Sequence, residues 1–539
     1  MQDEGVAVAD GMPQPIYAIE SRAYRATLRA HLGDSNAALG DVADAANQLD
    51  AVTSLAARRF LEADLQLARA AILARTQPRH ALSVVDSAVR FFVATSNPTR
   101  ILPALVARAD AWLAAGVVDS AVGDLRSATE VLDRRSAKIR STGTRADFLD
   151  AARDVSDRLV MMLARAGQDR DALMMLERVR VWGDGSERGS AANTSRRDPP
   201  WRIPRGTRVA EYARIGDTVL VWTQVDTTLS LTRSIVSSER LAQTTEAAQT
   251  ALQSRSEAGV ATAPLGQLYD WLIRPIESQL GPANTIVRVV ADGDIARVPF
   301  AALFDRQRRE FLSERYAFEY ASHLPVGGRQ PRRHQSGDKL VLIADPAFEP
   351  RRFPGLQRLP NAMEETREFA RLAPNAAMLS GPEATYAAVA ESMPGATLVH
   401  FAGHAVFDAA QPARSYLVVA PSEGRPDRIE AREIAVSDMS TTQLVVLSAC
   451  ATLRAYGGRS GSFSGLAGAF LQAGAGGVIA SDWLVDDDAA RELMVEFYRG
   501  YSVGQSPAIA LRAAQLHLLR ASRSPHALSV WAAFRYVSI

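Results

Sequence analysis

A histidine and the single cysteine of this chain each follow an apolar run that is typical of a buried strand. The run LVHFAG leads to His404, and the run QLVVLSA leads to Cys450, the one cysteine among 539 residues. In open parallel sheets, ligands and reactive side chains lie at the carboxyl ends of the strands. If the two strands are neighbours, an imidazole meets a thiol there, as a cysteine nucleophile with a histidine base requires.

The chemistry expected of such a pair is attack on a carbonyl carbon. The Cys450 thiolate is the expected nucleophile, while His404 keeps the thiol poised and then protonates the leaving amine. Two backbone N–H groups must hold the oxyanion, and the turns after the strands offer those of Cys450 and Ala405. The alternative stays open, since a lone cysteine at a strand end is more often a small buried apolar residue. His400, on the same strand as His404, is expected to be a packed, hydrogen-bonded core histidine, with a supporting role to His404 as the alternative.

The elements that must position these side chains follow from the pattern after residue 339. The runs KLVLIAD, ATLVHFAGH, YLVVA, QLVVLSAC, GGVIASDW and WAAFRYVSI are predicted strands, and NAMEETREFARL and FSGLAGAFLQAG are predicted helices. Because the strand runs are almost wholly apolar, both faces must be covered, which predicts a mostly parallel sheet between helices. Upstream, the alternating stretch 209–236 with Gly216-Asp217 at its turn predicts a hairpin or meander.

The first part of the chain, from residue 16 to about 182, has the pattern of successive helices. Four similar segments each carry an alanine and an apolar residue where a second helix opens: Ala38-Leu39, Ala81-Leu82, Ala121-Val122 and Ala172-Leu173. Their spacings of 43, 40 and 51 residues exceed the period of about 34 of a tetratricopeptide repeat, so the segments resemble a loose version of that repeat. Stacked repeats expose a concave groove that usually binds protein; a helical bundle without a ligand is the alternative.

Composition excludes several classes of function. A formal net charge of +1 offers no electrostatic case for binding nucleic acid or an anionic membrane. One cysteine excludes an intramolecular disulfide and multi-cysteine metal sites, and the motifs GxSxG, HExxH and GxxxxGK[ST] do not occur, so we expect neither a metal nor a cofactor. Neither a signal peptide nor a membrane span is visible, and we expect a cytoplasmic protein. The acidic run Asp486–Asp488 is predicted to cap a helix, with a calcium site as the alternative.

Longer strings resemble one family. LVHFAGHAVFD and, with its cysteine 46 residues after His404, LVVLSACATL resemble the CHAT domain, a caspase-like peptidase family that is related to separase and often found with tetratricopeptide repeats. LPNAMEETREFARL, the segment after the cysteine and the terminal WAAFRYVSI also resemble the family. Upstream, VVADGDIARVPFAAL resembles its amino-terminal half, a degenerate copy of the caspase fold. The resemblance places the catalytic pair on His404 and Cys450.

The resemblance implies an α + α/β organisation: helical tetratricopeptide-like repeats over 1–182, a linker over 183–200, a degenerate caspase-like half over 201–335 and an active caspase-like half over 336–539. The linker is rich in Gly, Ser and Pro. Its arginines, Arg188, Arg196 and Arg197, are candidate autocleavage sites if specificity is basic, and otherwise plain solvated charges.

Specificity also follows from the resemblance. In caspase-like peptidases, the pocket for the residue before the cleaved bond is lined from two strand ends that flank the catalytic pair, and these positions match Asp345 and Asp482. Two carboxylates favour a basic side chain, so the resemblance implies cleavage after Arg or Lys. The alternative is that both aspartates only cap turns.

The resulting expectation is a cysteine endopeptidase that cleaves a partner protein and is regulated by a protein bound to the repeats. The family suggests regulated proteolysis in a bacterium, in defence or cell death. This chain departs from the family pattern at two places. The family usually has Gly where this chain has Ala405. It also often has SACETG where this chain has SACATL, with Ala451 and Leu453. The alternative is an inactive scaffold that mediates protein–protein interaction.

Overall fold

The computed structural model describes residues 2–10, 12, 14–74, 76–136, 142–184, 203–204, 206–254, 258–324, 338–373, 375–449, 452–453, 463, 465–521 and 525–538. The chain divides into two compact units, Met1–Met175 and Leu176–Ile539. None of the helices within these described ranges is both long and apolar enough to cross a membrane.

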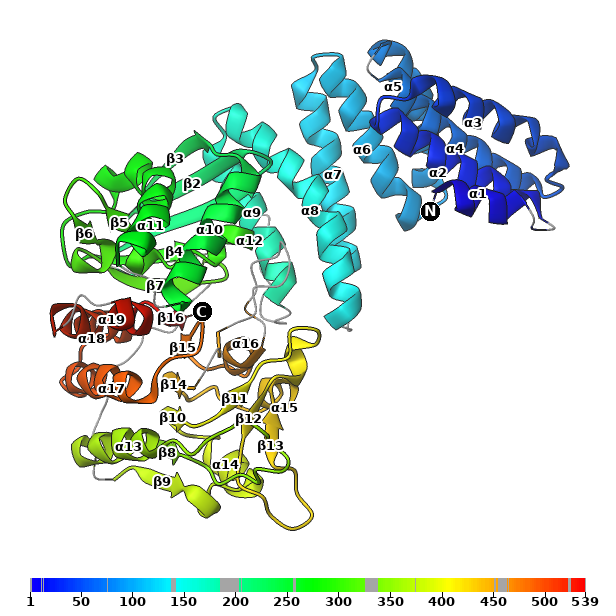
Figure 1. Cartoon of the computed structure of the whole chain (residues 1–539). Coiled ribbons are helices and arrows are strands. Elements are labelled where there is room, and N and C mark those ends of the chain that lie inside the picture. Colours follow the sequence, from blue (N-terminus) through cyan, green and yellow to red (C-terminus); the bar gives the residue numbers. More distant parts are fainter. Residues whose placement is uncertain are drawn as a thin grey trace. The chain divides into compact units, whose positions relative to one another are not determined.

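The first unit is helical, as the sequence predicts (Figure 1). Its helices are α1 (Gln2–Asp10), α2 (Pro15–His31), α3 (Ser35–Asn47), α4 (Leu55–Leu73), α5 (Pro78–Ala94), α6 (Pro98–Ala114), α7 (Val118–Ser136), α8 (Thr142–Arg165) and the first part of α9 (Asp169–Asp184). Local chemistry sets several of their starts. The Asp34 side chain accepts from the Ala37 N–H at 3.1 Å, and a proline opens α2, α5 and α6, where its missing N–H costs nothing.

The four alanines of the sequence pattern occupy equivalent places in this unit. Each is the fourth residue of a helix, in α3, α5, α7 and α9, and each is 0% exposed: Ala38, Ala81, Ala121 and Ala172. A methyl group at these points lets neighbouring helices approach closely. The predicted helical region is therefore confirmed, and a buried alanine recurs at the same place in four of its helices. Its assignment to tetratricopeptide-like repeats stays a prediction.

The second unit is built on a large sheet, which has 11 strands among the described residues, in the order β3-β2-β1-β4-β7-β16-β15-β14-β10-β8-β9. These strands are β1 (Thr207–Ile215), β2 (Thr218–Val225), β3 (Thr228–Ile235), β4 (Ile286–Val290), β7 (Ala317–Ala321), β8 (Leu340–Ala344), β9 (Ala377–Ser380), β10 (Leu398–Ala402), β14 (Leu444–Ser448), β15 (Gly477–Ser481) and β16 (Phe534–Ser538). Small sheets pair β5 (Phe304–Asp305) with β6 (Glu310–Phe311), and β11 (Ala405–Val406) with β12 (Tyr416–Val418) and β13 (Arg428–Glu430).

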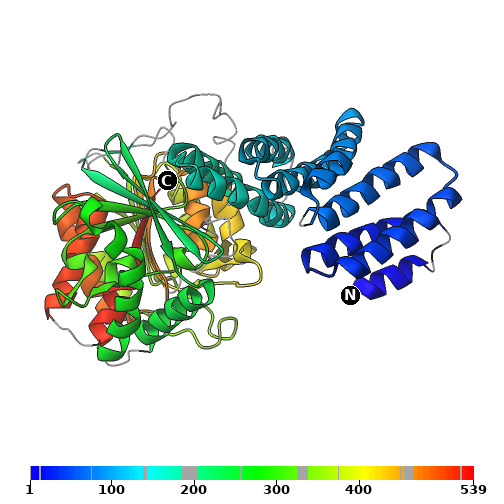
Figure 2. The ribbon, with the colours of Figure 1, turned by 90° about the horizontal axis from the view of Figure 1, so that it is seen from above.

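Helices cover both faces of the large sheet. They are α10 (Ser238–Gln253), α11 (Ala258–Leu272), α12 (Gly293–Ala296), α13 (Pro360–Leu372), α14 (Tyr386–Ser392), α15 (Ala431–Ala435), α16 (Gly465–Gln472), α17 (Asp487–Ser502), α18 (Pro507–Ala521) and α19 (Pro525–Trp531). Figure 1 shows α13, α17 and α18 on one side of the strands and α15 and α16 on the other. The view from above shows the same two sides, with red and green helices opposite yellow and orange ones (Figure 2). This arrangement confirms a mostly parallel sheet between helices.

Two details of the strand predictions can be compared directly. The predicted hairpin is present: β1 and β2 are antiparallel around Gly216-Asp217, and Gly216 has a φ of 58°, which a two-residue hairpin turn favours. The terminal strand is shorter than predicted, because Trp531 ends α19 and the strand begins at Phe534. Trp531 is 0% exposed, so its apolar character reflects burial at a helix end rather than a strand.

The order of the strands contains a topological switch point. From β8 the chain passes to β9 on one side and then returns to β10 on the other side of β8. Ligands of open α/β sheets bind at the carboxyl ends of strands where the order reverses in this way. Asp345 directly follows β8, and His404 follows β10 by two residues. The sheet therefore sets both residues beside the position where a ligand is expected.

Candidate active site

The strands that lead to the predicted catalytic pair are parallel neighbours and in step. β10 pairs with β14 so that Ala402 lies opposite Ser448. His404 follows Ala402 by two residues, and Cys450 follows Ser448 by two residues in the sequence. Cys450 itself lies outside the described residues. The adjacency of the two strands, which the sequence argument required, is present in the sheet.

The His404 ring is held in one orientation. Its Nε2 lies 2.6 Å from the Gln357 carbonyl oxygen, and the Phe348 ring meets it edge-on with the ring centroids 5.4 Å apart. A carbonyl oxygen only accepts hydrogen bonds, so Nε2 must carry the proton. In the neutral imidazole this leaves the Nδ1 lone pair to take a proton from a neighbouring acid.

The Ala405 amide points away from the strand that pairs with it. The Val418 N–H donates to the His404 carbonyl at 2.9 Å, so His404 and Val418 form a hydrogen-bonded pair of an antiparallel ladder. Such pairs alternate with non-hydrogen-bonded ones, and the next pair is Ala405 with Leu417. The Ala405 N–H therefore faces away from β12, in keeping with its predicted use for an oxyanion.

Ser481 fastens the chain on both sides of the cysteine position. This residue ends β15 and is 1% exposed. Its hydroxyl donates to the Ala449 carbonyl at 2.8 Å, and its carbonyl accepts from the Leu453 N–H at 3.0 Å. The chain is thus tied to β15 at Ala449 and again at Leu453.

A buried polar network lies beneath the two strand ends. Glu365 of α13 accepts from the Ser448 hydroxyl at 3.1 Å, and its other carboxylate oxygen lies 3.1 Å from Nε2 of His400. The Tyr498 hydroxyl of α17 lies 2.8 Å from Nδ1 of His400. His400 is 0% exposed, so it is the packed, hydrogen-bonded core histidine that the sequence predicts. The network joins α13, α17, β10 and β14 just before the positions of the predicted catalytic pair.

Loss of the Glu365 carboxylate should destabilise this region, and the size of the effect should depend on whether the new side chain can still accept a hydrogen bond. Glu365→Leu leaves the Ser448 hydroxyl and His400 without their shared acceptor and should lower the free energy of unfolding by about 2–4 kcal/mol. Glu365→Gln keeps one acceptor and should cost much less. Urea denaturation of both variants measures the difference, and equal losses would contradict the assigned role.

The same network predicts a pH dependence. Burial raises the pKa of Glu365 above its ordinary value of 4.5 and Asp487 raises it further, while His400 and Ser448 oppose the rise. Between 4.5 and the raised pKa the folded chain holds the extra proton, so the free energy of unfolding must fall as pH increases through this window. Glu365→Gln should remove this fall, because the amide does not titrate. Below the window Glu365 is protonated in both the folded and the unfolded wild type, so there it adds no pH dependence.

The first aspartate of the predicted specificity pocket already binds an arginine of this chain. Asp345 is 3% exposed and has a φ of 39°, a left-handed conformation that a non-glycine residue rarely adopts. Its Oδ2 accepts from Nε of Arg358 at 2.8 Å and from an Nη at 2.5 Å, and its Oδ1 accepts from the Leu359 N–H at 3.3 Å. The carboxylate therefore presents one oxygen to a guanidinium and holds the residue before α13 with the other.

The second aspartate lies farther along the same edge of the sheet. Asp482 follows β15, and β10 and β14 separate this strand from β8, so the two aspartates flank the strands of the catalytic pair. At about 4.8 Å per strand, β8 and β15 are roughly 14 Å apart. Asp482 is 7% exposed and forms an ion pair of 2.5 Å with the buried Arg535. Convergence of both aspartates on one pocket stays a prediction.

The acidic run at the start of α17 begins with the residue that caps this helix. The Asp486 side chain accepts from the Ala489 N–H at 3.3 Å, as predicted, and Asp487 accepts from the Asn361 N–H at 3.1 Å. Among the described residues, no group of three or more His, Cys, Asp or Glu side chains is arranged to hold a metal ion. Arg188, Arg196, Arg197 and Ala451 lie outside the described residues, whereas Leu453 is buried.

Sequence reasoning missed several residues that shape this site. Glu365 had a signal: it lies among the buried positions Ala362, Thr366 and Phe369 of an amphipathic helix, where a carboxylate needs a buried partner. Nothing in the sequence pointed to Gln357, because it contributes only its backbone carbonyl oxygen.

The architecture and the strand ends define the class of protein as one with a caspase-like peptidase fold. A chain of the Saccharomyces cerevisiae separase–securin complex aligns with 100% of this chain and 48% of its own length, at 8% identity and a TM-score of 0.51. A second structure of that complex aligns with 100% of this chain and 55% of its own, at 8% identity and a TM-score of 0.48. The complex of the Porphyromonas gingivalis RgpB pro- and mature domains aligns with 56% of this chain and 75% of its own, at 11% identity and a TM-score of 0.33.

The family follows from the sequence itself. The CHAT domain model matches residues 262–539, just over half of the chain, and the chain therefore belongs to the CHAT domain family. No curated protein sequence matches. The chain spans about half the length of the first separase chain, and an identity of 8% shows the fold alone.

Proposed function

We propose that this protein is a cysteine endopeptidase that cleaves a partner protein after an arginine or lysine. The observation that carries the proposal is the in-step pairing of β10 with β14, which puts the residues leading to His404 and to Cys450 side by side at one sheet edge. Membership of a family with a caspase-like peptidase fold supports it.

The proposed mechanism uses the His404 tautomer set by Gln357. Nδ1 takes the proton of the Cys450 thiol, and the thiolate attacks the scissile carbonyl carbon to form a C–S bond. The N–H groups of Ala405 and Cys450 hold the oxyanion. When the C–N bond breaks, Nδ1–H protonates the leaving amine, and a thioester remains. Water then attacks the thioester, gives a proton to Nδ1 and releases the acid and the thiol.

The proposed basic specificity is supported by the contact between Asp345 and Arg358. Two guanidinium nitrogens already sit on Oδ2 of this buried carboxylate. The Arg358 side chain is 61% exposed, so its guanidinium can leave the carboxylate for solvent without the other side chains moving. A substrate arginine held by further main-chain contacts can therefore displace it.

The proposal extends to regulation and compartment. A partner protein bound to the helical unit would control the peptidase, since stacked helix pairs commonly bind protein through a concave face. A reducing cytoplasm suits a peptidase that depends on its only thiol.

A covalent probe tests the proposal. A peptide acyloxymethyl ketone ending in arginine should modify Cys450, located by tandem mass spectrometry, and His404→Ala should slow the reaction. The same peptide ending in glutamate should react at least about tenfold more slowly, because a buried carboxylate repels it. If iodoacetamide alkylates Cys450 but neither peptide does, the inactive scaffold is the better assignment.

A further inference from the structure

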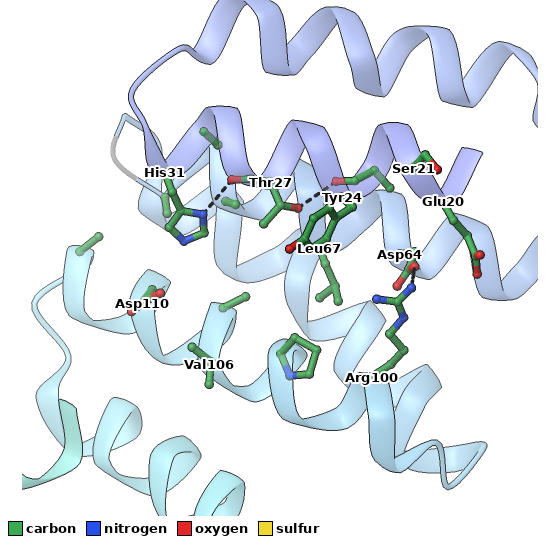
Figure 3. A pocket seen from close by; sticks show the side chains of 17 residues that line it. Glu20, Ser21, Tyr24, Thr27, His31, Asp64, Leu67, Arg100, Val106 and Asp110 are labelled. Carbon is green, nitrogen blue, oxygen red and sulfur yellow. Dashed lines mark hydrogen bonds and ion pairs between the residues drawn. The ribbon is translucent and has the colours of Figure 1, made fainter. Parts of the chain in front are cut away.

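The helical unit contains a hollow of about 780 Å³ between α2, α4 and α6 (Figure 3). Alanines line much of it, including Ala23, Ala30, Ala71 and Ala107, so the backbones leave space that larger side chains would fill. Tyr24, which is 65% exposed, stands at its side. The proposed peptidase chemistry uses none of these residues.

The dimensions of the hollow suit an extended peptide. Its lining runs from Glu20 to His31 on α2 and from Arg100 to Ala114 on α6, which is roughly 16–21 Å at 1.5 Å per residue. About five residues of extended chain, at roughly 3.3 Å each, match the length.

One end of the hollow has an excess of negative charge. Asp64 of α4 is 6% exposed and lies 2.6 Å from an Nη of Arg100. Glu20 of α2 lines the same end and forms no ion pair with a described residue (Figure 3). Burial raises the pKa of Asp64 to about 6 and Glu20 adds to the rise, although Arg100 opposes it. Above that pH, Glu20 and Asp64 bring two negative charges to this end, and Arg100 brings one positive charge.

The carboxylates of the lining are not spread evenly along the hollow. The third carboxylate of the lining, Asp110, is already held by Arg158 at 2.6 Å. The groups that favour a cation are therefore gathered near Glu20 rather than spread along the hollow.

We propose that this hollow binds an extended segment of a partner protein that carries a lysine or arginine. The cation of that side chain lies beside Glu20, at the end of the hollow that Asp64 and Arg100 also line, and neighbouring apolar side chains fill the space over Leu67 and Val106. The site does not depend on peptidase activity. It assigns a chemical class of partner to the helical unit.

Binding of short peptides tests the proposal in the full chain with Cys450→Ala and Asp345→Asn, which together prevent cleavage and weaken binding at the proposed specificity pocket. Fluorescein-labelled Ala-Leu-Xaa-Val-Ala peptides, with Lys, Arg, norleucine or Glu at Xaa, are titrated by anisotropy. Lysine and arginine should bind at least about tenfold more tightly than norleucine, and glutamate more weakly. The lysine peptide should bind more tightly as pH rises from 5 to 7.5, because Asp64 ionises with a pKa of about 6.

Variants locate the site. Glu20→Gln should reduce lysine binding to the norleucine level, and Ala107→Trp should fill the hollow and abolish binding of every peptide. Glu62→Gln, an exposed carboxylate of α4 outside the lining, should change nothing. Equal binding of lysine and norleucine, full binding to the Ala107→Trp variant or no binding at all would each overturn the proposal.

Discussion

Cys450→Ala abolishes peptide cleavage, with kcat/KM falling by at least about 10³-fold, because no other group of the chain replaces the nucleophile. His404→Ala gives a loss of similar size, since the thiol then lacks both its base and the acid for the leaving amine. The double variant loses no more than either single one, because nucleophile and base act as a unit. Peptides with arginine before a fluorogenic leaving group measure the rates.

Controls separate chemistry from folding in this experiment. Both variants should keep the thermal unfolding temperature of the wild type, because neither alters the Glu365 network or Ser481. His517→Ala is the matched control, since His517 is a half-exposed histidine of α18 paired with Glu492 and stands outside the site. Unchanged cleavage by the Cys450→Ala variant would remove the peptidase proposal and leave the interaction scaffold.

Asp345→Asn lowers kcat/KM for cleavage after arginine by about 10- to 100-fold, because a hydrogen bond between two charged groups becomes one to a neutral amide. The amide oxygen can still accept from the Leu359 N–H, so the contact with the start of α13 is retained. Cleavage after an uncharged residue, already slow, should change little. The ratio of kcat/KM for two peptides that differ only at that residue is the measurement.

Arg358→Ala should act in the opposite direction. Removal of the internal guanidinium frees Asp345, so KM for arginine peptides should fall a few-fold while kcat stays near its wild-type value. Arg352→Ala is the matched control, because Arg352 belongs to the same loop, is half exposed and pairs with Asp427 at 3.0 Å. A rise in KM on Arg358→Ala would mean that Arg358 supports the pocket instead of occupying it.

Much of the architecture could be predicted from local patterns in the sequence. Apolar runs bounded by turn residues located β8, β10, β14 and β15, and the recurring alanines located the second helix of each pair. A strand buried on both faces or a helix packed through one small residue leaves its mark within a few adjacent positions. His404 and Cys450 could be singled out for the same reason, since each directly follows such a run.

Only the tertiary structure decided which groups meet. The sequence contains no local sign that Gln357 offers its carbonyl to His404, that Arg358 pairs with Asp345 or that Arg535 pairs with Asp482. These contacts join positions between 13 and 53 residues apart. The order of the strands and the paths of the loops set them, and the spacing of residue types along the chain does not record that order.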